Sequence, residues 1–355
     1  MRNVQLLYLG LLCLLLLVMG IGLVAPLPLK DSCDADTTIA TFETLRDLSF
    51  IKENVQRLET IVKKKVNFRN TLIHWNSFIK FRFFNSSINT DQAVIGKDGW
   101  LYYSSKSDKI YESFTRQNRY RYEELKAALD KIQSRTITLA NNNIQYCHAI
   151  WPNKSTIYPE YLPDRYKRQQ QTKASKMTQF FNGNNSNNLP LVDIRDTLMY
   201  LKDATLLYLK HDSHWNDLGA YYAYVALMQQ LHIQPYPLSD FEVSWETSYK
   251  GDLLSLIGLC NATSITEKIP VLKYKGHKVI EKIERDGKTG PLFSCAQAEQ
   301  KKTLLMFRDS YGSALRQFIS LHFETAYYPW KQYDAAMVKE LEPDVVICAQ
   351  VERYL

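Results

Sequence analysis

The sequence predicts a layered α/β fold with a central, mostly parallel sheet, preceded by an N-terminal apolar helix. Beyond residue 89, helical patterns alternate with short apolar runs of strand length, an alternation typical of α/β layers. Polar, chemically versatile side chains follow two of those runs. The chain has 355 residues, with 45% hydrophobic and 23% charged residues, which are ordinary values for a folded protein.

Residues 1–30 predict a transmembrane signal-anchor. The apolar stretch from Leu6 to Leu27 is long enough, at about 1.5 Å per residue, to cross a bilayer core of about 30 Å. A cleaved signal peptide is the alternative, although Pro26 makes Ala25 a poor cleavage site. Arg2 precedes the stretch and acidic residues follow it. The positive-inside rule then predicts a single-pass protein of the inner (cytoplasmic) membrane with its folded domain on the outer side, in the periplasm.

Residues 31–88 predict a helical stalk or cap next to the membrane. Apolar side chains recur there at helical spacing, namely Leu45, Leu48, Ile51, Val55, Leu58 and Val62. A second stretch, Phe68 to Phe84, is rich in aromatic and basic residues. The folded domain, residues 89–355, is expected to open with a hairpin, because Asp98-Gly99 lies between two apolar runs.

The rest of the domain follows the α/β alternation. A helix is expected around Tyr122–Ile132, and a polar, weakly patterned insertion over residues 262–302. The other expected elements are strands at Ile144–Trp151, Thr205–Leu209, Thr303–Phe307 and Val345–Cys348, and helices at Leu218–Leu231 and Ser313–Leu321.

Charge and cysteines limit the possible functions. The net charge is +7, without a compact basic stripe or a nucleic-acid-binding motif, so no nucleic-acid partner is expected. Cys147 and Cys348 lie in apolar runs and are expected to be buried. Cys260 and Cys295 flank a polar, lysine-rich segment, and a disulfide between them is a hypothesis that depends on the extracytoplasmic location.

Asp212 and His214 form the first candidate site. They are two residues apart at the start of an expected helix, so one turn can direct both into a cleft, where the aspartate fixes the tautomer of the histidine. Helix capping is the alternative explanation. His211 and His214 are also conceivable metal ligands, but the sequence offers no evident third ligand, so no metal site is predicted.

Ser310 forms the second candidate site. It follows an apolar strand and precedes a helix, a position in which a serine is exposed and amides point toward a developing oxyanion. A capping serine is again the alternative. Because active sites of open α/β sheets gather at the carboxyl ends of the strands, we predict a triad of Ser310, His214 and Asp212.

The chain resembles the alginate O-acetyltransferase family of the AlgJ/AlgX type, whose catalytic domain is similar to SGNH hydrolases. The similarity spans about residue 67 to the end and includes the blocks Val94–Tyr102, Pro152–Lys154, Ile157–Pro163, Asp212–Asn216, Arg308–Tyr311 and Pro343–Val346 with Val351–Leu355. It implies a three-layer fold in which the Asp/His block precedes the serine block, the reverse of ordinary SGNH hydrolases.

The resemblance also implies the roles of the site residues. Ser310 would be the nucleophile, His214 the base and Asp212 its orienting carboxylate. The amides of Ser310 and Tyr311 are our first choice of oxyanion donors, because the usual Gly and Asn blocks are not evident. Asn153, Arg308 and Gln350 are side-chain candidates for contacts with the oxyanion or substrate.

The function implied is O-acetyl transfer to hydroxyls of a polysaccharide, alginate or another exopolysaccharide, through an acetyl-serine. A membrane-bound O-acyltransferase is the expected acetyl donor, and no cofactor is expected. Two alternatives stay open. The same triad with water as acceptor makes a carbohydrate esterase, and an unreactive serine would leave a membrane-tethered, non-catalytic subunit of polysaccharide assembly.

Overall fold

The computed structural model describes residues 69–84, 92–105, 109–184, 188–248, 251–259, 264–277, 279–282 and 290–355. The expected signal-anchor and most of the expected stalk lie outside these ranges. Across the described ranges, none of the helices combines the length and the apolar character needed to cross a bilayer. The membrane anchor therefore stays a prediction from the sequence.

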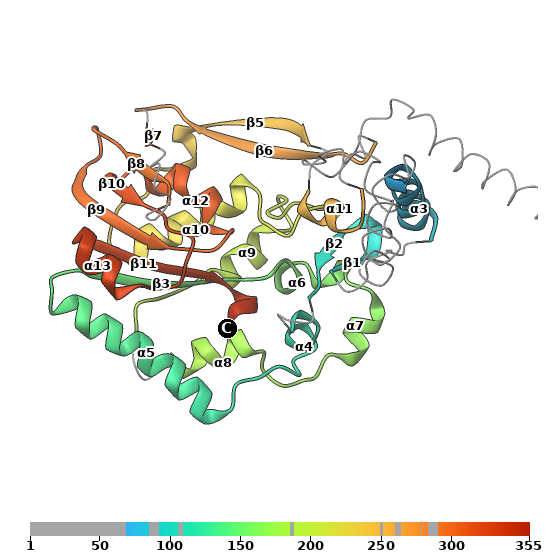
Figure 1. Cartoon of the computed structure of the whole chain (residues 1–355), viewed down its shortest axis with the longest axis horizontal. Helices are drawn as coiled ribbons and strands as arrows, with labels where there is room; N and C mark the ends of the chain where they lie inside the picture. Colours follow the sequence, from blue (N-terminus) through green and yellow to red (C-terminus); the bar gives the residue numbers. More distant parts are fainter. Residues whose placement is uncertain are drawn as a thin grey trace, which may run out of the picture.

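A seven-stranded mixed sheet forms the centre of the molecule (Figure 1). Its order is β4-β3-β11-β9-β10-β8-β7, in which the first five strands are parallel and β8 and β7 are antiparallel additions at one edge. The strands are β3 (Gln145–Trp151), β4 (Leu191–Asp193), β7 (Ile280–Lys282), β8 (Leu292–Ser294), β9 (Gln300–Phe307), β10 (Phe323–Tyr327) and β11 (Val345–Val351). The predicted strands at β3, β9 and β11 are confirmed.

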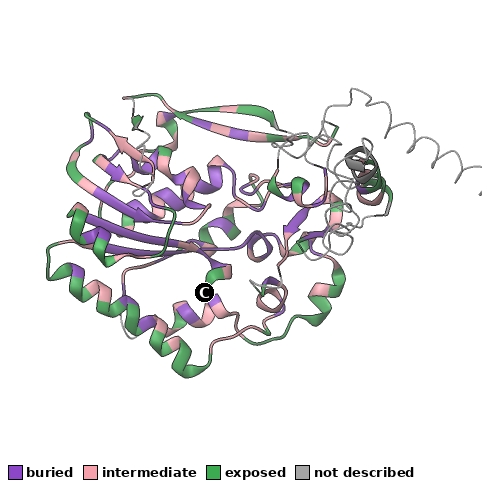
Figure 2. Cartoon of the chain, in the orientation of Figure 1, coloured by how far each residue is buried: buried purple, intermediate pink, exposed green. Residues whose placement is uncertain are grey.

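Helices cover both faces of this sheet, which gives the predicted three layers (Figure 1). One face packs against α9 (Arg195–Leu201), α10 (Asp217–Gln230) and α12 (Gly312–Ile319), and the other against α5 (Tyr122–Ala140), α8 (Lys176–Gly183) and α13 (Ala335–Leu341). The residues of β11 alternate accordingly, with Ile347 in the first core and Val346 and Cys348 in the second. Figure 2 shows the buried strands of the sheet and the exposed outer face of α5, whereas α10 in the other layer is largely buried.

Two hairpins and several short helices complete the described fold. The predicted Asp-Gly hairpin is confirmed, since Asp98 and Gly99 both adopt positive φ, 53° and 74°. The elements are α3 (Arg69–Phe84), β1 (Ala93–Ile95), β2 (Leu101–Tyr103), α4 (Ile110–Phe114), α6 (Lys154–Ile157), α7 (Asp164–Gln169), β5 (Phe241–Ser248), α11 (Asp252–Leu256) and β6 (Glu267–Tyr274), with 3-10 turns at Lys97–Gly99, Pro159–Tyr161, Leu238–Asp240 and Glu352–Tyr354.

The expected strand at Thr205–Leu209 is wrong. This segment forms only an isolated bridge between Tyr208 and Trp215. Its backbone bonds are made to the residues just after it, because Asn216 N donates to Leu207 O and Leu209 N to the carbonyl of His214. The apolar run is buried as a loop that folds back on itself, so Asp212 and His214 do not follow a strand of the sheet.

The expected insertion over residues 262–302 is also wrong in part. It contains β6, which pairs with β5 in the second hairpin, and β7 and β8, which extend the central sheet. β7 forms one edge of the central sheet and β8 is its antiparallel neighbour, while β6 belongs to a two-stranded ribbon. Antiparallel strands can face solvent on one side and accept polar residues there. Their apolar pattern was therefore too weak to predict a strand.

The start of α10 yields the first prediction. A methyl group at Gly219 would lie 2.4 Å from the Leu207 carbonyl oxygen and 2.8 Å from Trp215 Cβ. In an open helix, alanine is favoured over glycine by about 1 kcal/mol. Here we expect Gly219→Ala to lower the free energy of unfolding by about 1–3 kcal/mol, because neither neighbour can move freely. Urea unfolding measures the change, and an unchanged or more stable variant would contradict this packing.

Candidate active site

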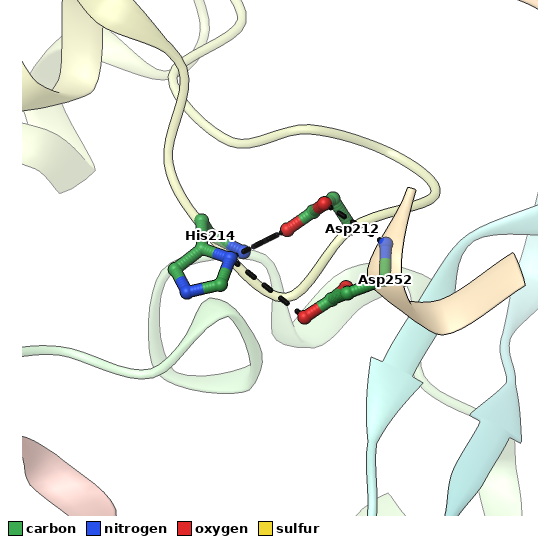
Figure 3. Close-up of side chains that lie close together, drawn as sticks. All are labelled: Asp212, His214 and Asp252. Atoms are coloured by element: carbon green, nitrogen blue, oxygen red, sulfur yellow. Dashed lines mark hydrogen bonds and ion pairs between the residues drawn. The ribbon is translucent and has the colours of Figure 1, made fainter. Parts of the chain in front are cut away.

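Asp212 and His214 form a directly bonded pair (Figure 3). Asp212 Oδ1 lies 2.6 Å from the Nδ1 atom of His214 and accepts a bond of 3.0 Å from the His214 amide. Burial would raise the pKa of Asp212, but its bonds to the His214 ring and to the Asp252 and His214 amides hold that pKa well below its usual range. An ionised Asp212 keeps the proton on Nδ1 and leaves Nε2 as the acceptor.

The Nε2 atom of His214 is buried and has no hydrogen-bond partner among the described residues. Figure 3 shows it on the side of the ring away from Asp212 and Asp252. The ring of Tyr311 lies beside the imidazole, with 5.0 Å between the ring centroids. Ser310 precedes Tyr311 in the turn between β9 and α12 and is half-buried. The structure thus brings this turn next to His214, without a bond between Ser310 and Nε2.

Asp309 and Tyr311 fix the turn on either side of Ser310. Asp309 accepts bonds from the Tyr311 amide at 3.0 Å and the Val351 amide at 2.6 Å. The Tyr311 hydroxyl donates to the carbonyl oxygen of Ser213 at 2.5 Å, which links the two halves of the site. The Tyr311 amide, an expected oxyanion donor, is therefore occupied by Asp309 in this structure. The Ser310 amide donates to none of the described residues and keeps that role as a candidate.

Arg308 and Gln350 do not reach the predicted positions. The Arg308 guanidinium donates to Tyr328 O, Asp309 O and Ser313 Oγ, so it ties the turn together. Burial lowers the pKa of Arg308 to about 10. Gln350 follows the alternation of β11 and lies on the sheet face of the second core, opposite the core that contains Tyr311.

Asn153 does lie near the site, at the end of β3. Its side-chain oxygen is 3.5 Å from the NH1 atom of Arg353, and its backbone N–H donates to the carboxylate of Glu352 at 3.0 Å. With Tyr311 it lines a pocket of about 250 Å³, part of which is open solvent. Asn153 therefore borders the site from the neighbouring strand.

The loop that contains Asp212 is held by a buried lysine. Lys154 Nζ donates to the carbonyl oxygens of Leu209, Lys210 and Asp212 at 3.0, 3.2 and 2.6 Å. Burial lowers the pKa of Lys154 to about 7, although nearby carboxylates, Asp212 first, oppose this shift. Nothing in the sequence reveals that the ammonium of Lys154 lies under a loop 55 or more residues away.

Glu267 and the first hairpin support the same loop. Glu267 accepts bonds from the amides of Lys210 and His211 at 2.6 and 3.2 Å, and His211 Nδ1 lies 3.5 Å from its carboxylate. His211 thus has a carboxylate neighbour that the sequence did not indicate. The Leu101 amide of β2 donates to Lys210 O at 3.0 Å. The block Val94–Tyr102 therefore helps to hold the loop that contains Asp212.

Asp252 is the site residue that sequence reasoning missed. Its carboxylate accepts bonds from Ser213 N at 2.7 Å and Ser213 Oγ at 2.5 Å, and lies 3.7 Å from His214 Nδ1. Gly251 permits this approach, since a Cβ there would lie 2.2 Å from the His211 carbonyl oxygen. A Gly-Asp pair before an apolar run was the available signal, but it is common at ordinary helix starts.

Asp252 also supplies the third metal ligand that the sequence did not reveal. Ligand atoms of Asp212, His214 and Asp252 all lie within 4.8 Å of one another, so by type and distance the three side chains could hold a cation. Their atoms are already used in hydrogen bonds, however, because His214 Nδ1 faces Asp212 and both oxygens of Asp252 bond Ser213.

The cysteines follow the predictions only in part. Cys147 and Cys348 are buried, as predicted, and are free thiols. Cys295 is also a free, buried thiol, with its Sγ 3.7 Å from Leu321 O. Cys260 lies outside the described residues. The hypothesis of a Cys260–Cys295 disulfide therefore finds no support, because Cys295 is enclosed in the core.

A serine turn, a carboxylate-bonded histidine and a mixed sheet with five parallel strands are the features of the SGNH hydrolase-like class. Residues 93–300 match the family model described as SGNH hydrolase-like domain, acetyltransferase AlgX, and the chain belongs to this family. The matched residues include Asp212, His214 and Asp252 and end before Ser310.

Curated relatives agree with this assignment. The chain is 27% identical over 173 residues to a probable alginate O-acetylase AlgJ of Pseudomonas aeruginosa, covering 47% of this chain and 41% of the relative. A Pseudomonas putida relative of the same name is 23% identical over 296 residues, which are 78% of this chain and 72% of that protein. The chain thus spans less than half the length of the first relative.

Solved structures support the fold alone. A DHHW family protein from Eubacterium siraeum aligns with a TM-score of 0.52 at 17% identity, covering 75% of this chain and 92% of that one. PatB1 of Bacillus cereus aligns with a TM-score of 0.53 at 14% identity, covering 74% and 96%.

The depressed pKa of Asp212 predicts how stability depends on pH. Asp212→Asn should lower the free energy of unfolding by about 1.5–3 kcal/mol near pH 6, because the charged acceptor is lost. The folded pKa lies below the unfolded value of about 3.9, so the contribution of the wild-type carboxylate is complete above that value and decreases progressively as the pH falls from there through the folded pKa. Urea unfolding should therefore show a smaller difference in stability between wild type and Asp212→Asn at pH 3 than at pH 6. An equal difference at both pH values would refute this prediction.

Proposed function

We propose that this protein is an extracytoplasmic, serine-dependent O-acetyltransferase that acts on hydroxyls of a polysaccharide. The observation that supports this most directly is the state of His214. Its Nδ1 atom is bonded to Asp212, while its Nε2 atom is buried, unpartnered among the described residues, and next to the Ser310 turn. An imidazole in this arrangement is prepared to accept a proton from a neighbouring hydroxyl.

In the first step, Ser310 Oγ attacks the carbonyl carbon of an acetyl donor and its proton passes to His214 Nε2. The tetrahedral oxyanion is stabilised by the Ser310 amide, which no described residue occupies. When the intermediate collapses, the bond to the donor breaks and the leaving group takes the proton from Nε2. The product is an acetyl ester of Ser310.

In the second step, a sugar hydroxyl gives its proton to Nε2 and attacks the ester carbonyl. Ser310 Oγ leaves as the tetrahedral intermediate collapses and recovers the proton from Nε2. Asp212 stabilises the imidazolium in both steps, as its low pKa keeps it charged. Over the two steps the acetyl group passes from the donor to the sugar, and the proton of the sugar hydroxyl replaces it on the leaving group, so the reaction needs no cofactor.

The names of the relatives support the choice of acceptor, and the expected membrane anchor supports the choice of donor. Relatives named alginate O-acetylases favour a polysaccharide acceptor, alginate or another exopolysaccharide. The expected inner-membrane anchor at residues 1–30 would hold the domain beside a membrane-bound O-acyltransferase, which we propose as the source of the acetyl group. A protein so tethered could receive acetyl groups that originate inside the cell.

The serine is tested by intact-protein mass after mixing with p-nitrophenyl acetate. We expect a transient acetyl adduct on Ser310, absent from Ser310→Ala and retained in Ser239→Ala, whose serine is exposed on a distant turn. Ser213→Ala should also form the adduct, because Ser213 Oγ is engaged by Asp252. An adduct that persists in Ser310→Ala would exclude the proposed nucleophile.

The fate of the adduct distinguishes transfer from hydrolysis. Discharge that is faster with an oligosaccharide acceptor than with water, with acetyl groups recovered on the sugar, supports the transferase. Equal discharge with and without the acceptor would replace it with the esterase. An adduct absent from the wild type would point to the non-catalytic subunit.

The Asp252 carboxylate should reduce the loss of activity caused by replacing Asp212. Asp252 lies 3.7 Å from His214 Nδ1, close enough to take over part of the role of Asp212 after a small shift. We expect Asp212→Asn with Asp252→Asn to slow adduct formation by about 10⁴-fold, the loss typical of a triad without its carboxylate. Asp212→Asn alone should lose at least about ten times less. Stopped-flow release of p-nitrophenolate measures both, and equal losses would deny Asp252 this role.

A further inference from the structure

Arg353 is a charged residue of the site region that the reaction above does not use. It follows β11, in the turn Glu352–Tyr354, and its guanidinium lies 5.0 to 5.6 Å from the ring centroids of Tyr103, Tyr311 and Tyr354. Its Nε atom is buried and has no hydrogen-bond partner among the described residues. The hydrogen bond from its NH1 atom to Asn153 Oδ1 is long, at 3.5 Å.

No carboxylate neutralises this guanidinium within ion-pair distance in the described part of the chain. The two acidic groups near it are committed elsewhere. Asp309 binds the amides of Tyr311 and Val351, and Glu352 binds Asn153 N and Thr156 Oγ1. Burial opposes the charged form of this half-buried guanidinium, but the tyrosines Tyr311 and Tyr354 and Asp309 favour that form and raise its pKa. A ligand that supplies negative oxygen atoms would bind directly to the donor that has no partner.

The guanidinium borders the pocket of about 250 Å³ next to the site. Its other lining residues include Tyr102, Tyr103, Asn153, Ser213 and Tyr311. A second depression shares Tyr102 and Tyr103 and continues toward α4. Tyr311 is common to the pocket and to the catalytic pair, because its ring also faces His214. A ligand in the pocket would therefore lie one aromatic ring away from the reacting groups.

We propose that this pocket is a carboxylate subsite, in which Arg353 binds the carboxylate of an acidic sugar residue of the acceptor. A guanidinium fits a carboxylate with two parallel hydrogen bonds, and the surrounding tyrosines offer faces against which a sugar ring can pack. Arg353 would then position the acceptor chain while a hydroxyl of it meets the acetyl-serine. The proposal deepens the proposed function and names Arg353 as its specificity-determining residue.

Binding is measured first, in a protein that cannot react. The Ser310→Ala variant is titrated calorimetrically with a hexuronate oligosaccharide and with the same oligosaccharide after reduction of its carboxyl groups to alcohols. We expect the acidic form to bind about 10- to 100-fold more tightly. Adding Arg353→Gln should abolish this difference. Equal affinity of the two oligosaccharides for Ser310→Ala would overturn the proposal, whatever the outcome for acetyl transfer.

The catalytic test separates Arg353 from the reacting groups. With p-nitrophenyl acetate as donor, Arg353→Gln should form the acetyl adduct within about twofold of the wild-type rate. Its KM for the acidic acceptor should rise about 10- to 100-fold, whereas its KM for the reduced acceptor should not change. A slower adduct formation with unchanged acceptor preference would overturn the proposal and assign Arg353 to the oxyanion instead.

Matched variants guard against effects of folding. Arg353→Lys keeps the charge but not the paired donors, so it should restore only part of the preference for the acidic acceptor. Arg135→Gln removes another arginine that lies over a tyrosine, at 4.3 Å from the Tyr333 ring, away from the pocket. It should leave both acceptor KM values as in the wild type. A loss of preference in Arg135→Gln equal to that in Arg353→Gln would refute a specific role for Arg353.

Discussion

The buried ammonium of Lys154 is the interaction on which the geometry of the site depends. Asp212 and His214 lie on a loop that no sheet strand precedes, so the sheet alone cannot position them. Lys154 begins the short helix after β3, and its ammonium donates hydrogen bonds to three backbone carbonyl oxygens of that loop. A lysine with its charge satisfied by backbone oxygens transfers the rigidity of the sheet to the loop, and the carboxylates beside it favour its charged form.

The site is assembled from two halves that meet at Tyr311. The serine turn belongs to the sheet, where Asp309 bonds it to β11. The Asp212–His214 loop is fixed separately by Lys154, Glu267 and Asp252. The Tyr311 hydroxyl joins the halves through the Ser213 carbonyl, and its ring contacts the imidazole. Short sequence blocks far apart in this chain therefore each secure one half of the site or its support.

The sequence was sufficient for elements with strong internal patterns. β3, β9 and β11 are buried on both faces, so their apolar runs stand out, and Asp98-Gly99 signals its turn through backbone conformation alone. The sequence was insufficient where contacts between residues far apart in the chain determine the local structure or the role of a residue. Leu207 and Tyr208 look like a strand because they are apolar, yet they are buried in a loop. Asp252 and Glu267 acquire their roles only when α11 and β6 pack against a loop some 40 to 57 residues away.

Arg308 and Arg353 demonstrate why residue type alone cannot assign a role. They follow the neighbouring strands β9 and β11, and each lies against an aromatic ring. The guanidinium of Arg308 finds three oxygen acceptors within its own turn and becomes part of the scaffold. That of Arg353 finds one distant amide oxygen and keeps a buried donor unused. A buried donor that the fold leaves without a partner beside a reactive centre is available to a ligand. The difference in hydrogen bonding, rather than the shared arginine, therefore separates a supporting residue from the recognition role that we propose for Arg353.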